Sequence, residues 1–193
     1  MTADANAEQD RARRFRDAAL PYLDDVFALA RYLLRNAADA EDAAQECYLR
    51  ALRHFDSYRG PAMKPWLLAI VRNICNAEFV RRGRQDVPTD CADDGPAADV
   101  TPIWQEPPAS PEAKLLRRQD DATIRRLIAA LPLAFREAIV LREVNELSYQ
   151  EIADVAGVPV GTVMSRLARA RSMLRSAWNA TEGAAETVSG NAS

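Results

Sequence analysis

Residues that build metal sites and disulfide frameworks are scarce in this chain. Its 193 residues include three cysteines and one histidine. Cys47, Cys75 and Cys91 are odd in number, widely spaced and never in a Cys-x-x-Cys pair, which argues against a disulfide framework. A structural zinc site needs about four ligands at characteristic spacing, and His54 is the only histidine. The sequence therefore predicts neither a metal centre nor a disulfide-stapled fold.

Membrane segments and catalytic motifs are also missing. No apolar run approaches the roughly 18 residues needed to cross a membrane, and residues 1–16 are polar and charged, unlike a signal peptide. We therefore expect a cytoplasmic protein without membrane insertion. The sequence has no glycine-rich phosphate loop, no nucleophile elbow and no cluster of metal ligands. These absences predict a protein without enzyme activity and without a cofactor.

Acidic charge and proline are concentrated in one segment, residues 85–113. This segment holds seven acidic residues, six of the eleven prolines and no lysine or arginine. Without its seven negative charges the chain would carry a net charge of +4 instead of −3, so the flanking parts are basic. Proline and charge at this density predict a flexible linker, which would span about 100 Å when fully extended.

The segments on either side of this linker have helical periodicity and no strand signal. Apolar residues recur at three- and four-residue spacing over 17–84 and again over 114–178. Residues 1–16 and 179–193 are expected to be an N-terminal tail and a disordered C-terminal tail. The predicted fold is all-α, with two small helical domains joined by a flexible acidic proline-rich linker.

The strongest motif, residues 148–175, predicts a helix-turn-helix. Ser148 and Glu151 form a capping box for a short helix, and Gly157 lies in the turn that follows. On the second helix the buried stripe is expected at Val163, Leu167, Ala170 and Leu174. The remaining surface has no acidic residue and includes Thr162, Met164, Ser165, Arg166, Arg169, Arg171 and Arg175. Such a face suits the major groove of DNA, where arginine binds guanine or phosphate.

Two further surfaces are candidate binding sites. A helix with Asp39 as its expected N-cap carries a polar row with one exposed leucine, which suits docking against another helix. The members of this row are Asp42, Gln45, Glu46 and Leu49. The next helix, expected to begin at Pro65, places Arg72, Asn73 and Asn76 beside Trp66, and such a group can bind an unstacked base. For the polar row, an ordinary solvated surface is as good an explanation as a docking site. For the group beside Trp66, a core tryptophan with solvated asparagines is the better explanation.

A series of strings in this chain resembles the extracytoplasmic-function (ECF) sigma factors of the sigma-70 family. Those of the first helical segment are Asp39-Ala-Glu-Asp-Ala-Ala-Gln-Glu, His54-Phe-Asp-Ser-Tyr-Arg-Gly and Trp66-Leu-Leu-Ala-Ile-Val-Arg-Asn. Those of the second are Leu131-Pro-Leu-Ala-Phe-Arg-Glu-Ala, Leu147-Ser-Tyr-Gln-Glu-Ile-Ala and Val160-Gly-Thr-Val-Met-Ser-Arg-Leu-Ala-Arg-Ala-Arg. The strings occur in the family's order and cover about 20–84 and 114–178.

The resemblance implies an RNA polymerase sigma factor, with 17–84 as sigma-70 region 2 and 114–178 as region 4. Region 2 would dock on the clamp helices of the largest polymerase subunit through Asp39, Asp42, Gln45, Glu46 and Leu49. Its implied contacts to the melted minus-ten strand are Arg59, Lys64, Trp66, Arg72, Asn73 and Asn76. Region 4 would lie near the polymerase flap and read the duplex minus-thirty-five element through Thr162, Met164, Ser165, Arg166, Arg169 and Arg171.

The resemblance also implies an anti-sigma factor as a partner, and it implies a fixed separation between the two promoter elements. The two promoter elements would lie about 16–17 base pairs apart, or about 55 Å, which is within the reach of the linker. Two positions depart from the family's pattern. Met164 stands where many members have lysine or arginine, and Lys64-Pro65 replaces the more usual polar pair before the tryptophan.

Three other functions compete with this interpretation. A stand-alone helix-turn-helix regulator explains 148–175 but not the first helical segment, and the chain has no dimerisation heptad. A sigma mimic that sequesters an anti-sigma factor predicts a degraded recognition helix, whereas this helix is intact. An enzyme would need the catalytic motifs that are missing. The sequence names neither the promoter set nor the inducing signal.

Overall fold

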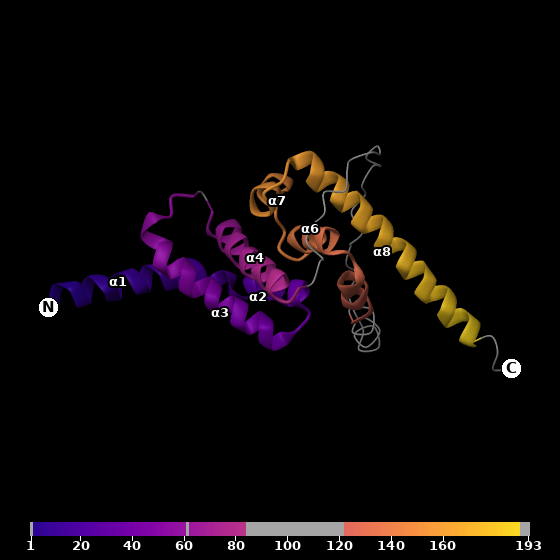
Figure 1. Cartoon of the computed structure of the whole chain (residues 1–193), viewed down its shortest axis with the longest axis horizontal. Coiled ribbons are helices and arrows are strands. Elements are labelled where there is room, and N and C mark those ends of the chain that lie inside the picture. The colour runs from indigo at the N-terminus through magenta and orange to yellow at the C-terminus, as the bar shows by residue number, and fades with distance from the viewer. Residues whose placement is uncertain (1, 61, 84–121, 190–193) are drawn as a thin grey trace, which may run out of the picture.

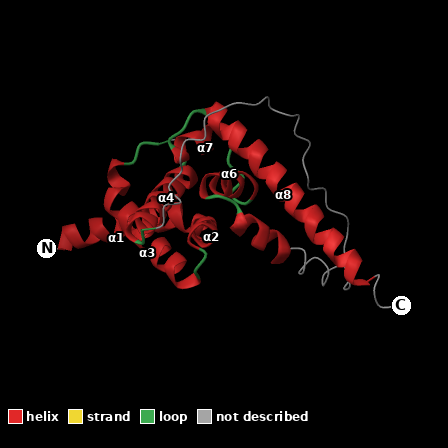
Figure 2. Ribbon diagram, turned by 45° about the vertical axis from the view of Figure 1, so that its right-hand side comes forward, coloured by secondary structure: helices red, strands yellow, loops and turns green. Residues whose placement is uncertain are grey.

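The chain forms two helical units (Figure 1). The computed structural model describes residues 2–60, 62–83 and 122–189, so the predicted linker 85–113 lies outside the described residues. The first unit consists of α1 (Thr2–Ala19), α2 (Leu23–Leu34), α3 (Ala37–His54) and α4 (Met63–Arg81), with 3-10 turns at Leu20–Tyr22 and Phe55–Ser57. The second consists of a helix over 122–130, then α6 (Leu133–Glu143), α7 (Tyr149–Ala156) and α8 (Val160–Ser189). Every regular element in these ranges is a helix (Figure 2), which confirms the all-α prediction.

Helices α2, α3 and α4 pack around one apolar core. Their buried side chains are Val26, Leu29, Ala30, Leu33, Leu34, Ala40, Ala43, Ala44, Cys47, Ala51, Leu67, Leu68, Val71, Cys75 and Phe79. Burial raises the pKa of the Cys47 and Cys75 thiols to about 12, so both remain protonated at neutral pH. Both are free cysteines, and they serve as small apolar core residues.

The N-terminal segment is a helix and not the tail that the sequence predicted. Helix α1 docks on the C-terminal end of α3, where Phe15 packs edge-on against Tyr48 and Phe55 with ring centroids 6.1 and 5.4 Å away. Phe15 is 7% exposed. A single aromatic residue among charged neighbours has no apolar periodicity, so the sequence showed no sign of this contact.

Two helices begin earlier than predicted. Helix α3 begins at Ala37 because Asn36, not Asp39, is the N-cap: the Asn36 side-chain oxygen accepts a hydrogen bond from the Asp39 N–H at 3.3 Å. Asparagine and aspartate cap helices equally well, so propensity does not separate the two positions. Helix α4 begins at Met63, which places Pro65 third in the helix. Its missing N–H still costs no helical hydrogen bond there.

The predicted capping box is present at the start of α7. The Ser148 hydroxyl accepts a hydrogen bond from the Glu151 N–H at 3.3 Å, and the Glu151 carboxylate accepts one from the Ser148 N–H at 2.8 Å. Gly157 ends the helix in the left-handed conformation, with φ of 66°, which favours glycine. These local signals fix both ends of α7.

Replacing Ser148 with alanine is expected to lower the free energy of unfolding by about 1 kcal/mol at neutral pH. Hydrogen bonds from Ser148 hold the pKa of the Glu151 carboxyl below its usual value. A lowered folded-state pKa contributes stability above the unfolded-state pKa, and this contribution is lost as the pH falls through the folded-state value. Urea unfolding at about pH 7 and about pH 3 should therefore show a smaller penalty in acid. An equal penalty at both values would contradict the capping-box assignment.

Helix α8 is longer than predicted. It continues to Ser189, so 179–189 is helical rather than a disordered tail, and 190–193 lies outside the described residues. In Figure 1 its C-terminal part extends away from the rest of the molecule. None of the helices in the described ranges has the length and apolar character that crossing a membrane requires.

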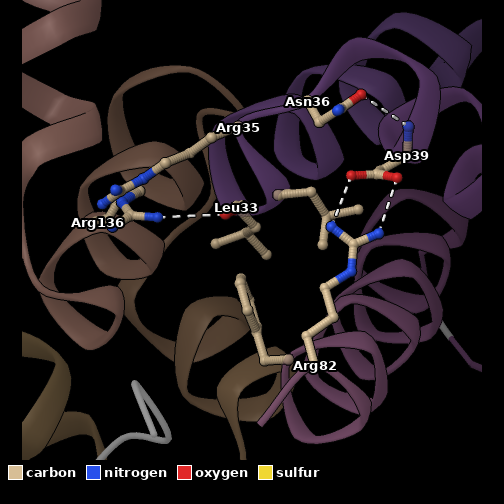
Figure 3. A pocket seen from close by; sticks show the side chains of 8 residues that line it. Leu33, Arg35, Asn36, Asp39, Arg82 and Arg136 are labelled. Carbon is tan, nitrogen blue, oxygen red and sulfur yellow. Dashed lines mark hydrogen bonds and ion pairs between the residues drawn. The ribbon is translucent and has the colours of Figure 1, made fainter. Parts of the chain in front are cut away.

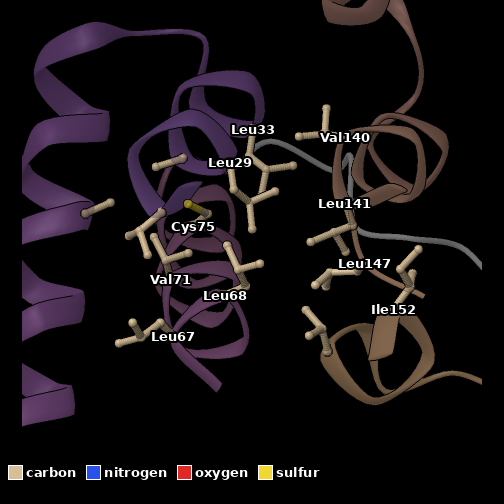
Figure 4. Packing of buried hydrophobic residues seen from close by; sticks show 14 of the residues in the cluster. Leu29, Leu33, Leu67, Leu68, Val71, Cys75, Val140, Leu141, Leu147 and Ile152 are labelled. Atoms are coloured by element: carbon tan, nitrogen blue, oxygen red, sulfur yellow. The ribbon is translucent and has the colours of Figure 1, made fainter. Parts of the chain in front are cut away.

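The two units lie against each other, with α2 and α4 of the first contacting α6 and α7 of the second. Side chains from both belong to one continuous apolar core. Figure 4 shows those that face one another, each at most 3% exposed: Leu29, Leu33, Leu68, Val140, Leu141, Leu147 and Ile152. The interdomain contact is therefore packed like a protein interior.

Buried polar side chains add hydrogen bonds across this interface. Arg136, 2% exposed, donates to the Leu33 carbonyl at 3.2 Å and to the Leu131 carbonyl at 2.7 Å. Asn145, 1% exposed, donates to the Asp25 carbonyl at 3.1 Å. Because the carbonyl groups of Leu33 and Asp25 belong to α2, these bonds fix α6 and the turn after it in one position on the first unit.

Candidate nucleic-acid interface

The first turns of α8 are the second helix of the helix-turn-helix, and one side of them is accessible. Val163 and Leu167 are each 1% exposed and Ala170 is fully buried, which confirms these three members of the predicted stripe, while Leu174 is half-buried. The opposite side presents Met164, 45% exposed, together with the half-buried residues Thr162, Ser165 and Arg169. Accessible hydroxyl and guanidinium groups on one helix face can reach base edges and phosphates.

Arg166 does not lie on the exposed face where the sequence placed it. The residue is 7% exposed and lines a small cavity together with Glu137 and Ile152. On a helical wheel Arg166 lies about 40° from Ala170, so it borders the buried stripe. Helix α6 packs on this side of α8 and covers it. Helical periodicity places Arg166 beside the buried stripe, but only the packing of α6 decides that its side chain is buried.

Arg171 is also engaged inside the second unit. Its guanidinium donates to the Glu143 carboxylate at 2.7 Å, and its side chain is 13% exposed. This ion pair connects α8 to α6. Arg175, one turn further along α8, is exposed.

The α3 row that is predicted to dock on another helix lies at the surface. Asp42, Gln45 and Leu49 are exposed, and Leu49 has 51% of its surface accessible. Glu46 is half-buried and pairs with Arg50 at 2.6 Å. An exposed leucine between polar side chains is a suitable centre for a helix-docking contact.

Asp39, the other residue implied to dock on the polymerase, is held within the first unit. Arg82 donates to both of its carboxylate oxygens at 2.8 Å, which ties the start of α3 to the end of α4. Hydrogen bonds to Asp39, and then to Glu78, raise the pKa of Arg82. The pair borders a cavity of about 460 Å³ between the two units (Figure 3), lined by Leu33, Leu34, Arg35, Asn36, Asp39, Phe79, Arg82 and Arg136.

The loop between α3 and α4 is shaped by an aromatic pair. The rings of Tyr58 and Trp66 stack with centroids 4.4 Å apart and an interplanar angle of 27°. Gly60 lies against the Tyr58 ring, where an added Cβ would be 2.6 Å from Tyr58 Cε2. Burial raises the pKa of the Tyr58 hydroxyl. One face of Trp66 is therefore covered by Tyr58, and the close approach of Gly60 keeps the loop in this shape.

Helix α1 braces the start of the same loop. Arg11 donates to the Leu52 carbonyl at 2.7 Å and pairs with the Asp56 carboxylate at 2.6 Å. Arg59 is exposed, and its guanidinium donates to the carbonyls of Asp56 and Tyr58 at 2.6 and 2.9 Å. Because Asp56 lies in the turn before the loop, α1 determines where the loop leaves α3.

Two residues predicted to contact the melted strand are engaged within the protein. Lys64 Nζ lies 2.8 Å from the Asp25 carboxylate. Arg72 of α4 forms an ion pair with Glu137 of α6, and their side chains are 13% and 3% exposed. The other candidates on α4 differ in access, since Asn73 is exposed while Trp66 and Asn76 are half-buried.

Sequence reasoning missed several residues that shape these surfaces. Arg11 has no local signal, because its partners are distant in sequence. Glu137 did carry a local signal, because an acidic residue inside the apolar stretch of α6 suggests a buried partner. Tyr58 lies in a segment that resembles the family, but it was not among the predicted contacts to the melted strand. Over the described residues no three His, Cys, Asp or Glu side chains are grouped as a metal site.

The fold and its exposed faces define a DNA-binding protein of the helix-turn-helix class that carries a second helical unit in the same chain. The family model for sigma-70 region 2 matches residues 19–85, and the model for sigma-70 region 4 matches residues 121–174. The chain belongs to the sigma-70 family, as an RNA polymerase sigma factor of the ECF group.

Individual relatives agree with this assignment. The RNA polymerase sigma-H factor of Pseudomonas aeruginosa is 35% identical over 164 residues, which are 84% of each chain. The ECF RNA polymerase sigma-E factor of Escherichia coli K12 is 35% identical over 148 residues, 72% of this chain and 73% of that one.

Two solved structures share the fold. The sigma factor RpoE, in complex with the anti-sigma factor NepR from Bartonella quintana, has a TM-score of 0.65 at 26% identity, covering 86% of this chain and 98% of that one. The structure of CnrH in complex with the cytosolic domain of CnrY has a TM-score of 0.63 at 22% identity, covering 91% and 94%.

Proposed function

We propose that this sigma factor reads the minus-thirty-five element as duplex DNA with its second unit and captures the melted minus-ten strand with its first. The observation that carries the proposal is the acid-free exposed face of residues 160–175 of α8, held on a capped helix-turn-helix in the same chain as region 2. Duplex binding by one unit sets the register. Binding of unstacked bases by the other offsets the cost of unpairing them.

The duplex contacts come from the accessible side of α8. Ser165 and Arg169 are the leading candidates, because their side chains are not fully buried and form no ion pair with another of the described helices. Thr162 and Met164 flank them, and the Met164 side chain suits an apolar contact such as a thymine methyl group. Arg166 and Arg171 would have to leave their packed positions before they could touch DNA.

The melted strand is proposed to bind beside the Tyr58–Trp66 stack. An aromatic platform with neighbouring amides binds unstacked bases by stacking and hydrogen bonds. Arg59, Trp66, Asn73 and Asn76 supply these groups. Lys64 and Arg72 would join them once their carboxylate partners were released.

The α3 row of Asp42, Gln45, Glu46 and Leu49 is proposed to dock on the clamp helices of the largest subunit of core RNA polymerase, with region 4 near the flap. Asp39 would hold the start of α3 in place for this contact through its ion pair with Arg82. We further propose an anti-sigma factor as a partner, supported by the related sigma factor RpoE in its complex with NepR. These partners place the protein in the cytoplasm, and it would act there as an initiation factor without catalytic activity.

The test is transcription by core RNA polymerase from promoter fragments of the chain's own genome. The native chain should produce transcripts with a fixed start site. Leu49→Asp should weaken core binding about tenfold, because a charge replaces the apolar centre of the docking row. Leu20→Asp is the matched control, since Leu20 is 47% exposed but lies outside this row. Duplex binding without any core-dependent transcript would indicate a stand-alone regulator. Failure of both activities would indicate a mimic.

Replacing Gly60 with alanine should impair capture of the melted strand. The new Cβ would displace the Tyr58 ring from Trp66, and an aromatic stack is worth about 0.5–1.5 kcal/mol, or about 3- to 10-fold in affinity. Fluorescence anisotropy with a single-stranded minus-ten oligonucleotide measures this loss. Binding to the duplex minus-thirty-five element should not change. An equal loss in both assays would point to misfolding instead.

A further inference from the structure

The cavity at the junction of α2 and α3 has the size of a small-molecule site. Its volume is about 460 Å³, and small-molecule sites in proteins commonly span about 300–1,000 Å³. It is bordered by the end of α2, the start of α3, the end of α4 and one side chain of α6, Arg136 (Figure 3). None of the side chains proposed to contact promoter DNA is among its described lining residues.

The polar part of this lining is positively charged. The described lining residues include three guanidinium groups, those of Arg35, Arg82 and Arg136, and one carboxylate, that of Asp39. Three positive charges and one negative charge leave a net charge of +2. Arg82 donates to both carboxylate oxygens of Asp39 at 2.8 Å, so Arg82 is the arginine that matches this negative charge. Guanidinium groups bind phosphate through paired hydrogen bonds, so the lining suits a phosphate.

Arg35 occupies a backbone position that favours glycine. It is the C-cap of α2 and adopts the left-handed conformation, with φ of 61°. This conformation costs free energy in any residue with a Cβ atom, so glycine is the usual residue at such a helix end. The Arg35 side chain extends toward Arg136 in Figure 3. An anion between two guanidinium groups would offset their mutual repulsion.

The start of α3 adds a further preference for an anion. Asn36, the N-cap of this 18-residue helix, and Asp39 in its first turn both line the cavity. The N-terminal end of a helix carries a partial positive charge, which stabilises a bound phosphate. The cavity therefore combines arginine side chains with a helix N-terminus.

The remaining lining is apolar. Leu33, Leu34 and Phe79 are 1%, 3% and 6% exposed, and all three border the cavity. An aromatic ring such as that of Phe79 packs well against another flat ring. A bare anion would leave this apolar side without a contact. The lining therefore suits a ligand that joins a phosphate to a flat ring.

We propose that this cavity binds a nucleoside phosphate. The phosphate lies between Arg35 and Arg136 beside the start of α3, and the base packs against Leu33 and Phe79. The inference goes beyond the proposed function and does not rest on it, because it uses no contact to promoter DNA.

Isothermal titration calorimetry of the full chain tests the ligand. The probes are adenosine diphosphate and guanosine diphosphate. Adenosine and inorganic pyrophosphate each carry only one half of the first probe. Both diphosphate nucleotides should bind, and each half should bind at least about tenfold more weakly than the whole nucleotide.

Arg35→Gly tests the site. It removes a guanidinium group but suits the left-handed backbone, so the thermal unfolding midpoint should be no lower than that of the native chain. Binding of both nucleotides should weaken about tenfold. Arg31→Ala is the matched control, because Arg31 is exposed on the last turn of the same helix and is not among the described lining residues. Arg169→Ala reports on the recognition helix. Both of these variants should bind the nucleotides as the native chain does.

Four results would overturn the proposal. The first is no measurable binding of either nucleotide at about 1 mM. The second is an equal loss in Arg31→Ala and Arg35→Gly, which would indicate a general effect of charge. The third is a loss confined to Arg169→Ala, which would place the nucleotide on the recognition helix. The fourth is equal affinity for pyrophosphate and adenosine diphosphate, which would show that the apolar side does not bind a base.

Discussion

Replacing Leu68 with alanine is expected to lower the free energy of unfolding by about 2–5 kcal/mol. Leu68 is fully buried in α4, where it contributes to the core of the first unit and faces the second unit (Figure 4). The substitution removes buried apolar surface and leaves a cavity that the surrounding helices only partly fill. Urea unfolding followed by far-ultraviolet circular dichroism measures the loss.

Val80→Ala is the matched control for this experiment. Val80 lies on the same helix but is 67% exposed, so the change in stability should stay within about 0.5 kcal/mol. If Leu68→Ala cost no more than Val80→Ala, Leu68 would not be buried in solution. The packing of α4 described above would then be wrong.

Replacing Arg169 with alanine is expected to weaken binding to the minus-thirty-five duplex by about 1–3 kcal/mol, or about 5- to 150-fold. Arg169 lies on the accessible side of α8 and has no carboxylate partner among the ion pairs described above. A bidentate bond to guanine would be lost together with its discrimination against other bases. Affinity for a native and a base-substituted duplex, measured at one salt concentration, gives both the loss and the specificity ratio.

Arg175→Ala is the comparison for the recognition helix. Arg175 is exposed on the same helix but lies beyond the proposed base contacts. Its loss should weaken all duplexes alike and reduce the salt dependence, as expected for a phosphate contact. If Arg169→Ala also weakened all duplexes equally, Arg169 would be a phosphate contact, and the reading of the bases would belong to Ser165 or its neighbours.

The helix-turn-helix could be predicted from the sequence because its determinants are local. Ser148 and Glu151 satisfy each other within one turn of helix, and Gly157 supplies the backbone conformation that ends α7. The stripe of Val163, Leu167 and Ala170 follows from helical periodicity alone. Interactions that act over three to seven residues can be read directly from the order of the residues.

The contacts that join distant segments could not be predicted in this way. Arg11 reaches the Leu52 carbonyl 41 positions away, and Arg72 meets Glu137 65 positions away. The N-cap of α3 is Asn36 and not Asp39 as predicted, because two good capping residues lie within one turn of each other.

The sequence by itself determined that this protein is all-helical, that it carries a capped helix-turn-helix with an acid-free recognition face, and that it resembles ECF sigma factors. Only the tertiary structure decided that α1 braces the loop before α4, that Arg166 is covered by α6, and that Arg72 is held by Glu137 across the two units. The physical reason is that periodicity defines the faces of a helix, whereas burial depends on which other helix packs against each face.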